Sequence, residues 1–167
     1  IIHCQEPMKV IICRIGKGKC SWADKAVLEW SKRIRQPLSL DEVRYKPAQE
    51  QSNMSLERGI EVRRLKESSQ IQSYLRESDI LIVVDERGVQ PSTEELTSWM
   101  QDYLHQGASR VVFAIGGPFG HHSSLRKQAD KVLSLSSMVV NHELARVILH
   151  EQIYRCYSLM TGGKYHH

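Results

Sequence analysis

The sequence lacks any apolar run long enough to cross a bilayer, which requires about 20 consecutive apolar residues. It also lacks internal repeats, low-complexity tracts and a long linker rich in proline or serine. Its 167 residues are 41% hydrophobic and 25% charged, as in an ordinary globular protein. These features predict one compact domain without a membrane anchor.

Cysteines are few and show no metal-binding arrangement. None belongs to a C-x-x-C motif or has histidines at zinc-site spacing; they are Cys4, Cys13, Cys20 and Cys156. We therefore expect free thiols and no bound metal. The formal charge of +4 is a mild bias toward polyanionic partners, but charge alone does not establish that a protein binds nucleic acid.

Strand and helix patterns alternate along the chain. β-Branched apolar runs predict strands at residues 8–15, 38–45, 79–85 and 111–115, with a further short strand within 133–140. Capping residues and helical apolar spacing predict helices at residues 21–36, 55–76, 92–104, 123–132 and 142–160. This alternation predicts an α/β fold, with a mainly parallel sheet flanked by helices in a single domain.

Glycine-rich loops follow two of the predicted strands. Gly16-x-Gly18 lies where dinucleotide-binding folds place their phosphate loop, but Ser21 stands where the third glycine belongs. This segment is either a basic solvated turn or a phosphate contact. Residues 116–120 and the loop at 86–88 should meet at the carboxyl edge of the sheet, where α/β proteins bind ligands. A tight turn is the alternative interpretation of residues 116–120.

Small polar residues lead into the last predicted helix. The serines within residues 133–141 can contact an adenosine-sized ligand, but they can equally form turns and a helix cap. The helix at 142–160 has apolar residues on two sides, so we expect one side to face the sheet and the other a second subunit. A wholly internal helix is the alternative.

Two pairs of residues near the end of the chain are candidates for contacting a substrate. His142 and Arg146 are four residues apart and share a face of the last helix. A hydrogen bond at the helix start and a solvated ion pair are the alternatives for these two residues. Tyr165 and His166 can stack on a base or contact phosphate, or belong to an idle terminus.

Four segments share their order and spacing with a known family. They are Ile115-Gly116-Gly117-Pro118-x-Gly120, Leu133-Ser134-Leu135-Ser136-x-Met138, His142-x-Leu144-x-Arg146-x3-Leu149-x-Glu151-Gln152-x-Tyr154-Arg155, and Tyr165-His166. In this order they resemble the ribosomal RNA large subunit methyltransferase H family, of the SPOUT or trefoil-knot class. The resemblance extends from Met8 to His166.

The resemblance implies a domain with a C-terminal trefoil knot that works as a homodimer. The family's enzymes transfer a methyl group from S-adenosyl-L-methionine to N3 of a pseudouridine in the helix 69 loop of large-subunit ribosomal RNA. The implied partner is either this RNA when free or the assembled ribosome. The implied cofactor-binding residues are Val84, Asp85, Gly116, Gly117, Ser136, Ser137, Met138, Val139, Val140 and Asn141. The implied catalytic residues are His142, Arg146, Tyr165 and His166, among which a histidine or tyrosine can accept the N3 proton.

Residues 1–7 lie outside the family pattern. We expect them to be an N-terminal extension, a remnant of a targeting segment, ahead of a methyltransferase domain at residues 8–167. This extension favours an organelle of a eukaryote, a chloroplast or mitochondrion, with bacterial cytoplasm as the alternative. Two other functions compete: a noncatalytic RNA- or ribosome-binding module that retains the fold, and a nucleotide enzyme that uses Gly16 and Gly18.

Overall fold

The computed structural model describes residues 6–49 and 53–165 of the chain. In this part, strands and helices alternate up to a long final helix. The strands are β1 (Met8–Ile15), β2 (Leu38–Tyr45), β3 (Ile80–Val89), β4 (Arg110–Ile115) and β5 (Lys131–Leu133). The helices are α1 (Ser21–Ser31), α2 (Leu56–Tyr74), α3 (Thr93–His105), α4 (Ser123–Gln128) and α5 (His142–Met160).

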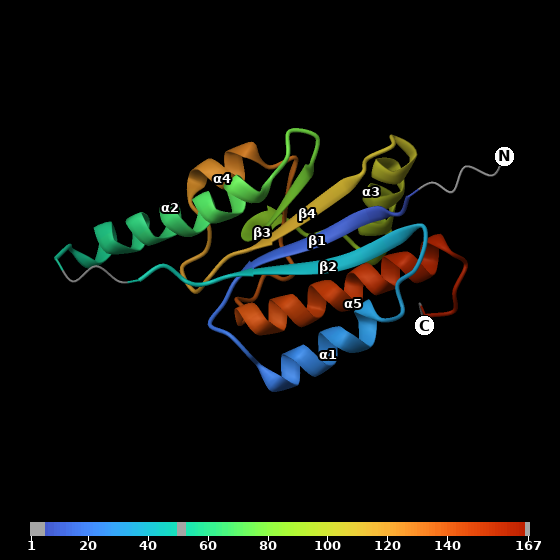
Figure 1. The fold of residues 1–167 in the computed structure, drawn as a ribbon, viewed down its shortest axis with the longest axis horizontal. Coiled ribbons are helices and arrows are strands. Elements are labelled where there is room, and N and C mark those ends of the chain that lie inside the picture. The colour runs from blue at the N-terminus through green and yellow to red at the C-terminus, as the bar shows by residue number, and fades with distance from the viewer. Residues whose placement is uncertain (1–5, 50–52, 166–167) are drawn as a thin grey trace.

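The five strands are parallel and form one sheet in the order β2-β1-β4-β3-β5 (Figure 1). Helices α3 and α5 cover one face of the sheet, with α1 packed against α5, and helices α2 and α4 cover the other face. The predicted α/β fold with its parallel sheet is therefore confirmed. The trefoil knot and the domain boundary at residue 8 stay predictions, and residues 1–5 lie outside the described part of the chain.

Successive residues of the central strands pack on opposite faces of the sheet. Val10 of β1 belongs to the same apolar cluster as Leu149 of α5, whereas the next residue, Ile11, packs in the cluster that contains Ile71 of α2. All four side chains are almost completely buried. Because both faces of β1 are covered, its sequence is a continuous apolar run rather than an alternating one.

Strand β3 is longer than the sequence predicts. Its apolar run predicts a strand at residues 79–85 and a loop at 86–88, but the strand continues through this segment to Val89. The extension exists because β5 pairs with β3 on both sides of an irregularity, so that Leu133 lies opposite both Val84 and Val89. The polar residues between these two positions therefore lie on extended backbone.

Strand β5 corrects the prediction of a helix ending near Val132. Helix α4 ends at Gln128, and the chain then turns into an extended conformation. The turn is fixed by Asp130, whose backbone N–H donates to the Leu81 carbonyl at 2.8 Å and whose carboxylate accepts from the Leu81 N–H at 2.7 Å. Pairing with β3 thus overrides the local helical pattern.

Gly88 is the residue that lets β3 and β5 approach so closely. A Cβ atom at this position would lie 2.5 Å from the carbonyl carbon and oxygen of Val132, and these are backbone atoms that cannot swing away.

Within the described residues, no helix is both long and apolar enough to span a membrane.

We expect Gly88→Ala to lower the free energy of unfolding by about 1–3 kcal/mol, the usual cost of overpacking a well-packed region. Urea denaturation measures this change. Gly59→Ala in α2 is the matched control, because a Cβ there meets nothing within 4 Å and alanine favours a helix by up to about 1 kcal/mol over glycine. Equal stabilities for the two variants would contradict the close approach of the strands.

Candidate active site

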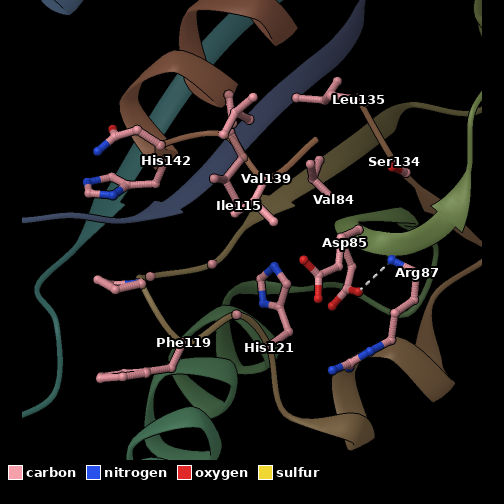
Figure 2. Close-up of a pocket in the computed structure, with 18 of the residues that line it drawn as sticks. Val84, Asp85, Arg87, Ile115, Phe119, His121, Ser134, Leu135, Val139 and His142 are labelled. Carbon is pink, nitrogen blue, oxygen red and sulfur yellow. Dashed lines mark hydrogen bonds between the residues drawn. The ribbon is translucent and has the colours of Figure 1, made fainter. Parts of the chain in front are cut away.

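A cavity of about 580 Å³ opens at the carboxyl edge of the sheet. Its walls come from the end of β3, the segment after β4, and the segment between β5 and α5 together with the first turn of α5. Figure 2 shows the side chains of Val84, Ile115 and Val139 gathered between His142 on one side and Asp85 on the other. The cavity therefore offers apolar walls with polar groups at its ends.

Most of the residues predicted to bind the cofactor line this cavity. They are Val84, Asp85, Gly116, Gly117, Ser136, Met138, Val139, Val140 and Asn141, and the candidate catalytic residue His142 joins them. Ser137 belongs to the same segment but is not among the lining residues. Neither Gly16 nor Gly18 lines the cavity, so it gives no support to the hypothesis of a nucleotide enzyme built on those two glycines.

The cavity also has lining residues that are not among the individually named cofactor-binding and catalytic residues. They are Arg64, Glu86, Arg87, Ile115, Pro118, Phe119, Gly120, His121, Ser134, Leu135 and Ala145. Several are neighbours of predicted residues and could have been found by extending each loop. Arg64 could not, because it comes from α2 and reaches the site through a hydrogen bond from its Nε to the Phe119 carbonyl at 2.6 Å.

The glycines after β4 serve close packing of main chain. The Gly120 N–H donates to the Gly117 carbonyl at 3.0 Å and closes a turn in which Gly120 has a φ of 74°. A Cβ on Gly116 would lie 3.0 Å from the Gly120 carbonyl carbon. A Cβ on Gly117 would instead lie 3.0 Å from Oε2 of Glu67, a carboxylate beneath the loop. A side chain at Gly117 would therefore require the Glu67 carboxylate or the loop to shift.

The serines before α5 form turns and line the cavity at once. The Ser134 hydroxyl donates to the Ser136 carbonyl at 2.9 Å, and the Ser136 hydroxyl accepts from the Met138 N–H at 3.0 Å. Asn141 caps α5 by accepting from the Glu143 N–H at 2.8 Å. The sequence left open whether these serines contact a ligand or form turns and a helix cap. Both are compatible, since the turns hold backbone groups at the cavity wall.

Asp85 and His121 are held in place at the polar end of the cavity. One Asp85 oxygen accepts from the Arg87 N–H at 3.0 Å, and the other lies 3.5 Å from the Arg126 guanidinium. His121 is buried, and its Nε2 donates to the Ala114 carbonyl at 3.0 Å. Burial lowers the pKa of His121 to about 4, although that hydrogen bond opposes the change. The ring is therefore neutral at physiological pH and fixed as one tautomer.

Arg146 lies in a buried cluster of charges instead of on the cavity wall. Its guanidinium reaches Glu42 of β2 and Asp24 of α1 at 2.7 Å each, and Glu143 at 3.1 Å. Arg14 of β1 joins the same cluster, 2.8 Å from Glu42 and 3.2 Å from Glu143. Arg146 therefore does not form the solvated ion pair that the sequence left as its alternative. In this chain, Arg146 ties α5 to the sheet and to α1.

The charge cluster changes the ionisation of its members. Burial alone would raise the pKa of Glu42, but hydrogen bonds from Arg146 and Arg14 outweigh it, so this pKa lies below its usual range. The hydrogen bond from Arg146 lowers the pKa of Asp24. Burial opposes the charge of Arg146, yet its carboxylate partners raise its pKa above the usual range. Asp24, Glu42 and Arg146 are therefore ionised at neutral pH.

Tyr165 lies at the opposite end of α5 from His142. Its ring packs 4.9 Å from the ring of Tyr154 and 5.4 Å from that of Trp30, and Arg155 covers it at 4.9 Å. Tyr154, which contacts the Tyr165 ring, follows His142 in α5 by 12 residues, which at 1.5 Å per residue corresponds to about 18 Å. Tyr165 therefore does not reach the cavity of its own chain, and His166 lies outside the described residues.

A cavity at the carboxyl edge of a parallel sheet is typical of α/β enzymes that bind a nucleotide-like ligand. The family model described as "Predicted SPOUT methyltransferase" matches residues 8–166. A protein of Geobacter metallireducens named ribosomal RNA large subunit methyltransferase H is 34% identical over 162 residues, which cover 96% of this chain and 99% of the relative. Proteins of the same name from Trichlorobacter lovleyi and Acetivibrio thermocellus are each 33% identical, over 96% and 95% of this chain and 100% and 99% of theirs. The chain belongs to the SPOUT methyltransferase family.

We expect Arg146→Ala to lower the free energy of unfolding by about 3 kcal/mol, because Glu42 and Glu143 then keep only Arg14 as an arginine partner in the cluster. The measurement is chemical denaturation followed by circular dichroism. Arg33→Ala is the control, since Arg33 pairs with Glu29 on the exposed surface and such pairs contribute at most about 1 kcal/mol. Unchanged stability of the Arg146 variant would show that the cluster does not hold α5.

Proposed function

We propose that this methyltransferase uses S-adenosyl-L-methionine to methylate N3 of a pseudouridine in the helix 69 loop of large-subunit ribosomal RNA. The observation that carries the proposal is the cavity made by the three predicted segments at one edge of the sheet. The printed names of the bacterial relatives support the RNA substrate.

The cavity suits this cofactor in size and in chemistry. Its volume of about 580 Å³ lies within the range of about 300–1,000 Å³ for small-molecule sites. Gly116 and Gly117 leave the main chain open to a ligand, while Val84, Ile115 and Leu135 offer apolar walls for an adenine ring. When bound, the cofactor supplies a methyl group made electrophilic by its sulfonium.

His142 is the group best placed to handle the acceptor's proton. Methylation of N3 requires loss of the imino proton, and a general base must come within hydrogen-bond distance of it. His142 lines the cavity, its side chain is 29% exposed, and its Nε2 lies 3.6 Å from Oε1 of Glu143. We assign His142 the role of proton acceptor and Glu143 that of orienting its ring.

A homodimer explains how the C-terminal residues can act at the cavity. Because Tyr165 sits at the far end of α5, we infer that the tail of one subunit reaches the cavity of the other. On α5, Leu144 and Ile148 are exposed at 46% and 37%, whereas Ile153 is buried in the chain's own core. The side with Leu144 and Ile148 is therefore our candidate for the subunit interface.

We expect purified protein to transfer labelled methyl groups from S-adenosyl-L-methionine to ribosomal RNA. Isolated bacterial ribosomes and protein-free RNA, each lacking the modification, are offered as separate substrates. Calorimetry of cofactor binding accompanies the assay. Cofactor-independent RNA binding without any methyl transfer would instead favour the noncatalytic module.

The dimer hypothesis predicts complementation between two inactive variants. His142→Ala and a chain without residues 164–167 should each lose at least about tenfold in rate, equivalent to roughly 1.4 kcal/mol of transition-state stabilisation. Mixed after unfolding and refolding, they should recover about a quarter of the wild-type rate, since half of the dimers hold one intact site. No recovery, with both variants still binding cofactor and dimerising, would mean that the tail does not act across the interface.

A further inference from the structure

A second cavity lies at the carboxyl ends of β1 and β2, beside the first. It has a volume of about 530 Å³ and is lined by Lys17, Arg44, Lys46, Pro47, Ala48, Gln49 and Arg63. Four of these seven residues carry a positive charge and none carries a negative one. Methyl transfer as proposed uses none of them. We call this cavity the basic groove.

Three cations of the basic groove are available to a ligand. Lys17, Arg44 and Lys46 are all exposed, and none forms an ion pair with a carboxylate within residues 6–49 and 53–165. Arg44 is also held in position, because its Nη1 donates to the Gly16 carbonyl at 3.2 Å. Arg63 differs, since its Nε lies 3.1 Å from Oε1 of Glu67. Clustered cations of this kind favour an anionic ligand.

The basic groove and the cofactor cavity share a wall. Oε1 of Glu67 accepts a hydrogen bond from the Ala48 N–H, which lines the groove, at 3.0 Å. Oε2 of the same carboxylate lies beneath Gly117, which lines the cofactor cavity. The Arg63 guanidinium lies 5.0 Å from the ring of Phe119, another residue of the cofactor cavity. A ligand in the groove is thus separated from the methyl donor's site by one layer of side chains.

We propose that the basic groove binds the phosphodiester backbone of the RNA next to the nucleotide that is methylated, an inference that rests on the proposed function. Lysine ammonium groups contact phosphate as point charges, and the Arg44 guanidinium presents paired donors that match phosphate oxygens. Such contacts position a nucleic acid without reading its bases. The groove supplies the positioning, and the neighbouring cavity supplies the chemistry.

The test is a salt titration of RNA binding by the double variant K17Q/K46Q. The probe is a fluorescent RNA hairpin with the sequence of the helix 69 loop. We expect affinity to fall at least about tenfold near 0.1 M salt, and the slope of log affinity against log salt to lose about 1.5, because each phosphate contact contributes roughly 0.7–0.9. Both lysines are exposed, so the fold and the cofactor affinity should not change.

The matched control is K66Q/K127Q, which removes the same charge from exposed lysines that line neither cavity. The proposal predicts wild-type RNA binding for this control. Equal losses in both variants would overturn it, because the effect would then follow net charge alone. So would a K17Q/K46Q protein that binds the hairpin as tightly as wild type.

Inorganic phosphate distinguishes RNA from a small anion. If K17Q/K46Q loses affinity for phosphate but keeps its affinity for the hairpin, the groove takes a free anion and the proposal fails. The outcome is separate from that of the proposed function, which is judged by methyl transfer from wild-type protein. Loss of hairpin binding in K17Q/K46Q supports the groove even if the wild-type protein methylates another nucleotide.

Discussion

Two buried guanidinium groups hold the last helix of the chain against the sheet. Arg14 extends from a central strand and Arg146 from α5, and both meet the carboxylates of Glu42 and Glu143. Buried charges are costly to leave unpaired, so the cluster tolerates only one arrangement of the elements that supply it. That arrangement brings the first turn of α5 against the loops of the sheet. The cofactor cavity therefore depends on a cluster that does not line it.

The cavity itself is made largely of main chain and small side chains. At its polar end, Asp85 is held by the Arg87 N–H and the Arg126 guanidinium, and His121 is buried and neutral. His142, at the edge of the cavity, differs from His121 in that its side chain has access to solvent. This arrangement suits a reaction in which the methyl donor is already activated, so that the protein mainly orients the reactants and removes one proton.

Local signals in the sequence could predict most of the fold. Apolar runs mark strands buried on both faces, and Ser92 with Glu95 forms the capping box that starts α3. The short strand expected within residues 133–140 lies instead at Lys131–Leu133, because its conformation comes from Asp130 pairing with Leu81, 49 residues away. Contacts between distant segments override local preference in such cases.

The same contrast applies to the site. Glycines and serines after strands are local signals, and the loops that carry them were found. The setting of Arg146 depends on Glu42, 104 residues away, and no pattern around either residue reveals that pair. Arg64 likewise enters the cavity wall through Phe119, 55 residues away. Helix spacing placed His142 and Arg146 on one face but could not tell which of them meets the cavity.

The buried carboxylate of Glu67 limits which residues position 67 can accept. It is 2% exposed, and its Oε2 has no hydrogen-bond partner among the described residues. An unsatisfied buried carboxylate oxygen lowers the stability of the fold, so an apolar residue of similar size would relieve that cost. The same replacement would release Arg63 and the Ala48 N–H and remove the support beneath Gly117. Breaking a buried ion pair costs more stability than one unsatisfied oxygen, so the stability of the fold and the shape of the wall between the two cavities both favour a carboxylate at this position.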